Sequence, residues 1–299
     1  MKLKLFLLRI IAFTLIPAAS VFAQDDLNAL LNESESPKKK EFATATFKGT
    51  RLINLHTVEV GGKRSLDFRI SHRFGSINGG LNEAFGLDGG ASIRLGLEYS
   101  YDGRLQFGVG RTNIDKTGDL FAKYRLLRQT TTRSMPISVT LFAGLYYTML
   151  KDPNKALGGK DKYENDHNRL SYAYQIIIAR KFSERFSFQL SPTMVHFNLV
   201  ERLTDKNDMF ALCAATRFKF TKRFALTAEY CWRATEWSRD TYYDSFALGF
   251  DIETGGHVFQ VQFVNSLGVL ENQFIPKTST KWSNAGIRLG FNISRMFNL

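Results

Sequence analysis

The sequence predicts an all-β fold: a transmembrane, antiparallel, up-and-down β-barrel of about twelve strands. From about residue 65 to Leu299, short segments alternate apolar and polar side chains one by one. Every second connection between these segments is a tight turn, and most of the others are long and polar. Outer-membrane barrels combine these two patterns. The sequence has no run of about 18 consecutive apolar residues that would predict a transmembrane helix.

The alternation gives each expected strand two different faces. In residues 91–101, Ile93 and Leu95 point to one side, and Arg94 and Glu98 point to the other. The same pattern predicts spanning strands at 65–75, 91–101, 104–113, 118–129, 136–150, 169–182, 184–199, 209–221, 223–235, 245–255, 257–267 and 285–298. Each of these ranges is near or above the ~9–11 residues that a tilted spanning strand needs.

The connections fall into two kinds. Tight hairpin turns are expected at Asp102-Gly103, Ser183-Glu184, Thr221-Lys222 and Gly255-Gly256. Long polar loops are expected at 76–90, 151–168, 200–208, 236–244 and 268–284. Because outer-membrane barrels keep short turns in the periplasm and long loops outside, both termini of the barrel are expected in the periplasm. A soluble β-sandwich would show the same period of two, but the loop asymmetry favours the barrel.

Residues 1–23 have the pattern of a secretory signal peptide. Lys2 and Lys4 precede an apolar run, and the segment ends at Ala23 in the small-x-small manner that a signal peptidase accepts. We therefore expect export and removal of this segment. Residues 24–41 are then predicted to be a flexible periplasmic leader.

Residues 42–64 are expected to form a separate N-terminal segment, followed by the barrel over 65–299. Their composition resembles that of a strand, but the alternation breaks at Gly49 and again at Leu52-Ile53. A segment of this kind does not fit a membrane-spanning strand, so we do not count it among the twelve.

The composition fits a barrel in the bacterial outer membrane. The chain has 26 Phe and 11 Tyr but only 6 Pro, which suits strands whose outer faces meet lipid. The net charge of +12 would usually suggest nucleic-acid binding, but an exported chain makes that partner improbable. A basic lumen or a surface facing anionic lipid is the expected use of the charge. Expected partners are outer-membrane lipid and, through the C-terminal strand, the barrel assembly machinery.

The side chains that face inward by parity include many charged groups of both signs. They are Asp67, Arg69, Arg73, Arg94, Glu98, Asp119, Lys123, Arg125, Arg217, Lys219, Glu229, Asp251, Glu253 and Arg288. One interpretation is a closed lumen braced by ion pairs, because buried charges must be paired. The other is a narrow polar channel whose charges select solutes. The bore of a barrel of this size does not decide between them.

Two inward positions carry the chain's only cysteines, Cys213 and Cys231. If the strands turn about Lys222, each cysteine lies nine residues from the turn, so the two are direct cross-strand neighbours. The Cβ–Cβ distance between directly opposed residues is close to the distance that a disulfide requires. A disulfide and a pair of free lumen thiols are both consistent with this placement.

The sequence predicts no metal, no cofactor and no enzyme. The histidines do not have metal-ligand spacing with one another; they are His56, His72, His167, His196 and His257. A hydrolase would need a nucleophile and a base on the same face of the wall. Ser191 has inward parity and His196 has outward parity, so they form no evident pair.

Several segments resemble an uncharacterised β-barrel family of Bacteroidota-type bacteria, a domain of unknown function. The most specific of them is Phe250-Asp-Ile-Glu-Thr-Gly-Gly-His257; the others are 46–54, 70–75, 85–88, 93–99, 123–129, 175–182 and 290–295. The resemblance implies an outer-membrane barrel and carries over no catalytic residue. The cysteines are not part of the family's pattern.

The resemblance also covers residues 46–60, ahead of the first expected strand. We hypothesise that this segment folds into the lumen or lies across the periplasmic mouth. Arg51, His56 and Glu59 would then meet the charges of the lumen.

The function expected from the sequence is that of a non-enzymatic outer-membrane barrel, serving as a small-solute channel or transporter with a charged lumen. The alternative is a closed barrel with a structural or partner-binding role in an envelope complex. An outer-membrane hydrolase is the third and least favoured interpretation.

Overall fold

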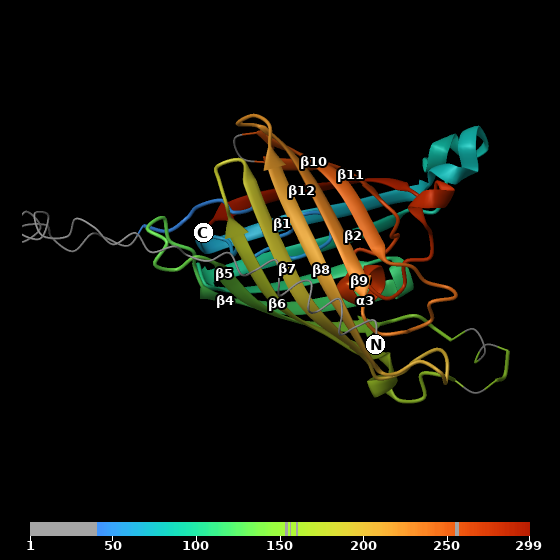
Figure 1. The fold of residues 1–299 in the computed structure, drawn as a ribbon. Coiled ribbons are helices and arrows are strands. Elements are labelled where there is room, and N and C mark those ends of the chain that lie inside the picture. Colours follow the sequence, from blue (N-terminus) through green and yellow to red (C-terminus); the bar gives the residue numbers. More distant parts are fainter. Residues whose placement is uncertain (1–40, 153–154, 156, 160, 255–256) are drawn as a thin grey trace, which may run out of the picture. The chain divides into compact units, whose positions relative to one another are not determined.

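A computed structural model describes residues 41–299, except 153, 154, 156, 160, 255 and 256. The predicted signal peptide and nearly all of the predicted leader lie outside the described residues. From Glu41 onward the chain forms one compact unit, built as a closed ring of antiparallel strands (Figure 1).

The barrel has twelve strands, which confirms the predicted fold. They are β1 (Lys63–Ser76), β2 (Ser92–Asp102), β3 (Leu105–Thr112), β4 (Thr117–Leu127), β5 (Ser138–Thr148), β6 (Leu170–Lys181), β7 (Phe186–Phe197), β8 (Asp208–Lys219), β9 (Phe224–Arg233), β10 (Ser245–Thr254), β11 (His257–Val264) and β12 (Arg288–Asn298). Each strand pairs with the next in the chain, and β1 pairs with β12 to close the ring. Closure leaves no sheet edge without hydrogen-bond partners, as a lipid environment requires.

In the described part of the chain, five short helical elements lie in the connections. They are η1 (Ile77–Gly86), η2 (Ile114–Lys116), η3 (Asp166–Arg169), α3 (Glu271–Phe274) and η4 (Trp282–Asn284). No helix in the described part of the chain has the length and apolar character needed to cross a bilayer.

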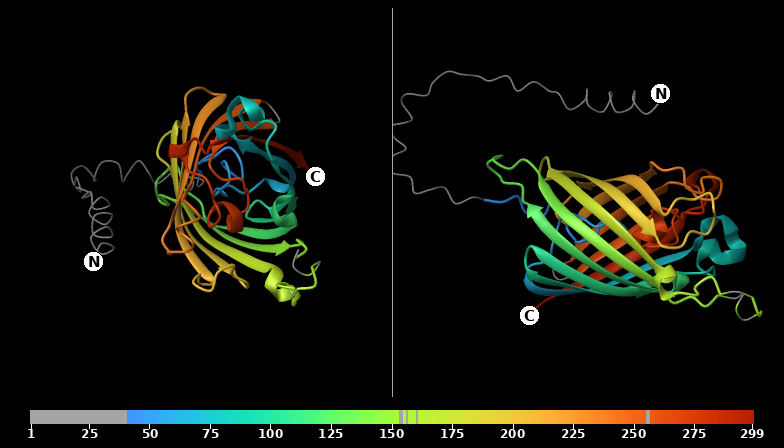
Figure 2. Two further views of the ribbon diagram at one scale, coloured as in Figure 1. Left: turned by 90° about the vertical axis from the view of Figure 1, so that its right-hand side faces the viewer. Right: turned by 90° about the horizontal axis from the view of Figure 1, so that it is seen from below.

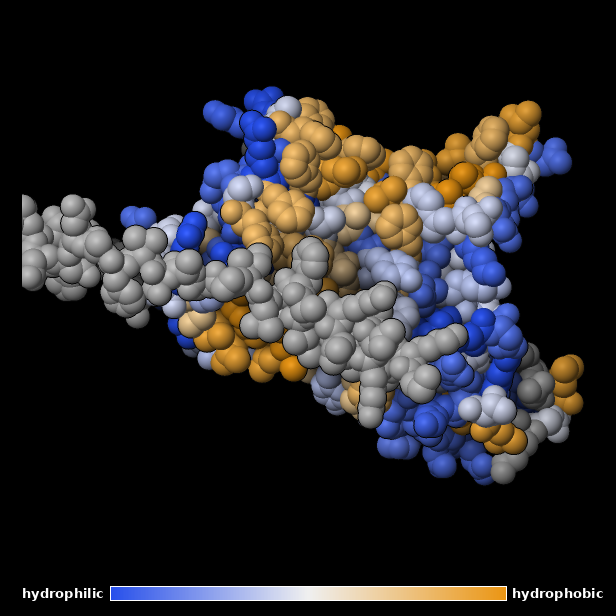
Figure 3. Space-filling view, in the orientation of Figure 1, coloured by the Kyte–Doolittle hydropathy of each residue, from blue (hydrophilic) through white to orange (hydrophobic). Residues whose placement is uncertain are grey.

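Side chains that alternate along each strand point alternately into the lumen and toward the outside of the barrel. In β2, Arg94 is 1% exposed and its neighbour Leu95 is 48% exposed. Other large apolar side chains, including Phe107, Val109 and Phe250, are also about half exposed on the outer wall. Figure 3 shows apolar residues gathered over the strands. An apolar outer wall of this extent would be costly in water and is suited to lipid.

The short turns lie at the end of the barrel where β1 begins and β12 ends. Because β1 starts there, the β2–β3, β6–β7 and β8–β9 turns are at the same end. The long connections after β1, β5, β7, β9 and β11 are at the opposite end (Figure 1). The two ends of the barrel therefore differ as the sequence predicts.

Residues 46–60, named the lumen segment, lie inside the barrel rather than in its wall. Seen end-on, the blue stretch of chain occupies the interior of the ring (Figure 2). The segment makes a small hairpin: the Thr57 N–H donates to the Thr50 carbonyl at 2.9 Å, and the Leu52 N–H donates to the Leu55 carbonyl at 2.9 Å. The hairpin tip is fully buried, since Leu52, Ile53 and Leu55 are at most 2% exposed.

A second insert enters from the opposite end. The connection between β11 and β12, residues 265–287, is named the lumen loop, and it carries the short helix α3. Val269, Leu270, Phe274 and Ile275 of this loop are buried in the main apolar cluster. The long connection predicted over 268–284 is present, but it is not a polar external loop, because residues 269–275 are buried. The last strand also begins later than predicted, at Arg288, because the preceding residues belong to this insert.

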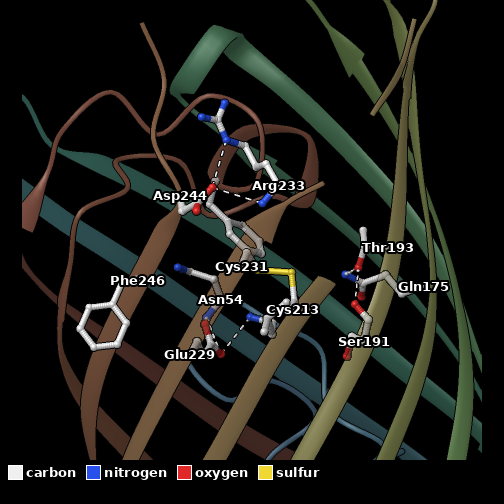
Figure 4. Close-up of a disulfide and its surroundings, with 12 residues drawn as sticks. Asn54, Gln175, Ser191, Thr193, Cys213, Glu229, Cys231, Arg233, Asp244 and Phe246 are labelled. Carbon is white, nitrogen blue, oxygen red and sulfur yellow. Dashed lines mark hydrogen bonds and ion pairs between the residues drawn. A yellow bond between two sulfur atoms is a disulfide. The ribbon is translucent and has the colours of Figure 1, made fainter. Parts of the chain in front are cut away.

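Cys213 and Cys231 face each other across β8 and β9 and are joined by a disulfide, with a Cα–Cα distance of 4.0 Å (Figure 4). Both side chains are buried on the lumen side of the wall. The bond closes a sequence separation of 18 residues that contains a tight turn. It therefore fastens together two strands that are already hydrogen-bonded.

We expect the purified, unreduced protein to take up no thiol-alkylating reagent after unfolding, and two equivalents after reduction, because both cysteines are held in the disulfide. Mass spectrometry of the intact chain measures the difference. Two labels without prior reduction would show that the thiols are free.

Candidate functional site

The lumen has two chemically different halves. The inward faces of β1 to β4 and of β9 to β12 carry most of the buried charged side chains. Those of β5 to β8 carry most of the buried apolar ones, interspersed with Ser, Thr and Gln. The buried apolar members of this second half include Phe142, Tyr146, Ala173, Ile177, Ala179, Val195, Phe197, Met209, Ala211 and Ala215. They form one cluster with Leu52, Leu55 and Val58 of the lumen segment. The lumen segment thus presents its apolar side chains to the apolar half of the wall.

Most of the predicted inward charges are buried in the barrel. Asp67, Arg69, Arg73, Arg94, Glu98, Asp119, Lys123, Arg217, Glu229 and Asp251 are at most 4% exposed. Arg125, Lys219, Glu253 and Arg288 are partly exposed. Lys219 lines a cavity at the short-turn end together with Thr221 and Lys222. The lumen charges are therefore concentrated in the middle of the barrel and thin out toward its ends.

Ion pairs between wall strands run along the wall and not across the bore. Arg94 on β2 pairs with Asp119 on β4 at 2.6 Å, and Arg217 on β8 pairs with Glu253 on β10 at 2.5 Å. Among the described residues, such pairs join strands at most two places apart in the ring. The wall is braced locally, and the groups that bridge the bore belong to the two inserts.

Glu229 on β9 holds the tip of the lumen segment. Its carboxylate accepts the main-chain N–H groups of Ile53 at 2.7 Å, Asn54 at 2.9 Å and Leu55 at 3.0 Å. Figure 4 shows Glu229 and Asn54 facing each other below the disulfide. Hydrogen bonds to a charged group are about twice as strong as neutral ones. Three of them converge here on one buried carboxylate.

Other side chains of the wall donate hydrogen bonds to oxygen atoms of the lumen segment. Arg73 donates to the Asn54 side-chain oxygen at 2.7 Å, and Asn292 donates to the Ile53 carbonyl at 2.9 Å. Lys123 donates to the Glu59 carbonyl at 2.7 Å. Buried main-chain groups are costly when unpaired, and the wall supplies partners for them around the segment.

The two inserts meet at Arg51. Its guanidinium lies 3.5 Å from Glu98 of β2 and 3.4 Å from Glu271 of the lumen loop. The Tyr146 hydroxyl donates to the other oxygen of Glu271 at 2.7 Å. The ring of His56 packs on Phe142, with ring centroids 4.3 Å apart. The contact of Arg51 with Glu271 therefore joins the lumen segment, which enters from the short-turn end, to the lumen loop, which enters from the long-loop end.

The hypothesis about residues 46–60 named Arg51, His56 and Glu59 as the groups that would meet the lumen charges. Arg51 and His56 lie among the lumen charges, and Glu59 pairs with Arg125 at 3.0 Å. Glu271 was not among the predicted site residues. The signal that could have indicated its burial is the apolar stretch Val269-Leu-Glu-Asn-Gln-Phe-Ile275, which is unusual for an exposed loop.

Cavities remain at both ends of the barrel. One of about 550 Å³ lies at the short-turn end, lined by Lys48, Thr50 and Asp67 among others. One of about 410 Å³ lies at the long-loop end, lined by Asn272 and Lys277 among others. There the Lys277 ammonium, 3.0 Å from Glu201, holds the pKa of that carboxyl below its ordinary value. The inserts lie between the two cavities.

The lumen offers no catalytic pair or metal centre among the described residues. Ser191 is buried on the lumen side of β7 and accepts a hydrogen bond from Gln189. His196, of opposite parity on the same strand, pairs with Asp208 at 2.6 Å. No group of three His, Cys, Asp or Glu side chains in the described part of the chain has the arrangement of a metal site.

The closed ring, the apolar outer wall and the polar interior define a transmembrane β-barrel protein with an occupied lumen. The chain belongs to the family of the Membrane bound beta barrel domain (DUF5777), whose model matches residues 47–297. The match begins within the lumen segment, so the family includes this insert as well as the strands. No curated protein matches the chain.

Solved barrels of low sequence identity are similar to this chain. A KdgM porin in complex with disordered oligogalacturonate has 9% identity and a TM-score of 0.46, covering 79% of this chain and 99% of its own. An outer membrane channel from Pseudomonas putida F1 has 12% identity and a TM-score of 0.46, covering 80% and 98%. The outer membrane protein Omp33 of Acinetobacter baumannii has 10% identity and a TM-score of 0.43, covering 80% and 100%.

We expect Glu229→Gln to loosen the tip of the lumen segment. An amide offers a single acceptor oxygen and turns its own N–H toward the main-chain donors. The loss of charge-assisted hydrogen bonds, each worth about 1.5–3 kcal/mol, is expected to speed amide exchange of Ile53, Asn54 and Leu55 roughly tenfold or more. Hydrogen-exchange mass spectrometry measures the change.

The matched control is Asp251→Asn. Asp251 is a lumen carboxylate of similar burial whose partners, Gln260 and Arg217, belong to the wall. Its replacement is expected to leave exchange in the lumen segment unchanged. Equal acceleration in both variants would mean that Glu229 acts only through general barrel stability.

Proposed function

We propose that this protein is an outer-membrane channel or transporter for small solutes, closed in the described conformation by the lumen segment and the lumen loop. The observation that carries the proposal is that the bore is blocked by chain inserts and not by side chains of the wall. The ion pairs between wall strands stay within the wall. Withdrawal of the inserts would therefore leave a bore lined on one side by charged and amide groups that water can solvate, and on the other by the apolar side chains of β5 to β8.

Orientation is part of the proposal. The short turns and both ends of the barrel sequence would face the periplasm, and the long loops would face outward, as is general for such barrels. The lumen segment then enters from the periplasm, because it is continuous with the start of β1. The preceding leader and signal peptide are proposed to occupy 24–41 and 1–23. A periplasmic partner could reach the segment through that leader.

The alternative is a permanently closed, non-enzymatic barrel with a structural or partner-binding role. The contact of Arg51 with Glu271 favours it, because this contact ties the two inserts to each other inside the barrel. A barrel of this kind would conduct nothing in any state in which it remains folded.

Planar-bilayer recording separates the two functions. We expect the full-length protein to be mostly closed and Glu229→Gln to raise the open probability roughly tenfold or more, since the segment loses about 1.5–3 kcal/mol of anchoring. Deletion of residues 42–60 removes one insert and also Arg51, the partner of Glu271 in the other, so it is expected to release the lumen loop and to give a steadily open pore. Asp251→Asn is expected to behave as the parent protein does.

The deletion variant is to be checked first for the strand content and heat resistance of a folded barrel. A folded deletion variant that passes no current would overturn the channel proposal and support the closed barrel.

A further inference from the structure

We propose that the lumen is a binding site for peptide main chain and that short peptides are the class of solute it takes. This inference rests on the proposed function, since a solute can reach the site only when the lumen segment moves. The argument is that the wall already binds one peptide, its own lumen segment, mainly through groups that every peptide shares.

Main-chain N–H groups of the lumen segment are bound by two acceptors of the wall. Glu229 accepts three consecutive N–H groups at the tip, those of residues 53–55. Gln189 accepts the N–H of Val58 at 3.2 Å. An array of three successive N–H donors is a property of a peptide turn and does not depend on its side chains.

Main-chain carbonyls are bound by a larger set of donors. The pairs are Lys123 with Thr50 and Glu59, Asn292 with Ile53, Gln189 with His56, Thr140 with Val58, and Arg125 with Val60. Lys123 and Arg125 lie on β4, and the other donors lie on β5, β7 and β12, so the donors surround the segment. A wall that needed only to fill its bore could have used apolar side chains throughout.

Gln189 shows the recognition most clearly. Its amide nitrogen donates to the His56 carbonyl at 2.8 Å, and its amide oxygen accepts from the Val58 N–H at 3.2 Å. A carbonyl and an N–H two residues apart are what one edge of an extended peptide presents to a neighbouring strand. The Gln189 amide therefore pairs with the main chain of the segment as a neighbouring strand would. Both of these bonds to the segment are made to main-chain atoms.

The side chains of the lumen segment contact wall groups of matching chemistry. Leu52, Leu55 and Val58 join the apolar cluster of the wall, and Arg51 and Glu59 meet opposite charges. This arrangement favours a peptide with an apolar side and a polar side. A saccharide of similar size offers hydroxyl groups but lacks the fixed carbonyl and N–H spacing that Gln189 matches.

A peptide probe must compete with the tethered lumen segment, and this competition determines the probe concentration that is needed. A tethered segment acts at an effective concentration on the order of mM. The probe is therefore blocked tetra-alanine, whose ends carry no charge, supplied to the full-length protein in detergent at about ten times that level. We expect it to displace the segment and to accelerate amide exchange of Ile53, Asn54 and Leu55 at least threefold. A disaccharide of similar mass at the same concentration is expected to leave exchange unchanged.

Transport gives a second readout. In proteoliposomes holding the full-length Arg51→Gln protein, whose lumen segment has lost its ion pairs with Glu98 and Glu271 while the wall keeps its main-chain partners, we expect blocked tetra-alanine to enter at least threefold faster than the disaccharide. Gln189→Leu is expected to remove most of this preference. Gln175→Leu is the matched control and should keep it, because the Gln175 amide bonds Thr193 of the wall (Figure 4).

The outcomes distinguish this inference from the proposed function. Equal entry of peptide and disaccharide, or a preference unaffected by Gln189→Leu, would overturn the peptide site while leaving the channel intact. No entry of either probe, together with an absence of current, would overturn the channel and the peptide site with it. Unchanged exchange at residues 53–55 in saturating peptide would also count against the site.

Discussion

The structure depends on one constraint: every main-chain N–H and C=O that enters the barrel must find a partner there. The strands satisfy it with each other by closing the ring. The lumen segment cannot, because only part of it forms a hairpin of its own. Glu229, Gln189 and Lys123 supply the missing partners. The buried polar groups of the wall are arranged around a peptide, and this arrangement explains why so many of them are tolerated in the interior.

The two halves of the wall determine how the segment lies. An apolar half alone would leave its main-chain groups unpaired, and a charged half alone would leave Leu52, Leu55 and Val58 against charges. Apolar side chains gather on β5 to β8, with Thr140 and Gln189 among them as main-chain partners, and charged groups such as Glu229 lie on other strands. One orientation of the segment therefore satisfies both requirements. The disulfide of Cys213 and Cys231 joins β8 to β9 two residues from Glu229, the main anchor of the tip on β9.

The strands could be predicted from the sequence because their period of two is a local signal. Arg94 and Leu95 are assigned to opposite faces by their neighbours alone, and the structure places them so. Burial of the inserts is not a local property. In the sequence Glu271 resembles an exposed loop residue. Its burial depends on contacts such as that with Arg51, which lies 220 positions away in the chain. Inward parity indicated charges, but the apolar half of the lumen was missed because apolar inward residues such as Ile177 and Val195 do not stand out from outward ones.

The contact of Arg51 with Glu98 and Glu271 links the two ends of the barrel energetically. Removing the segment from the lumen takes Arg51 away and leaves both carboxylates buried without this partner, which is costly in a low-dielectric interior. Glu271 retains Tyr146, whose hydroxyl is a weaker partner than a guanidinium. Movement of the lumen loop would remove Glu271 from the same arginine. Because coupling free energies are reciprocal, whatever loosens the loop at one end also loosens the segment at the other. A solute that displaces either insert therefore lowers the free energy needed to move the second.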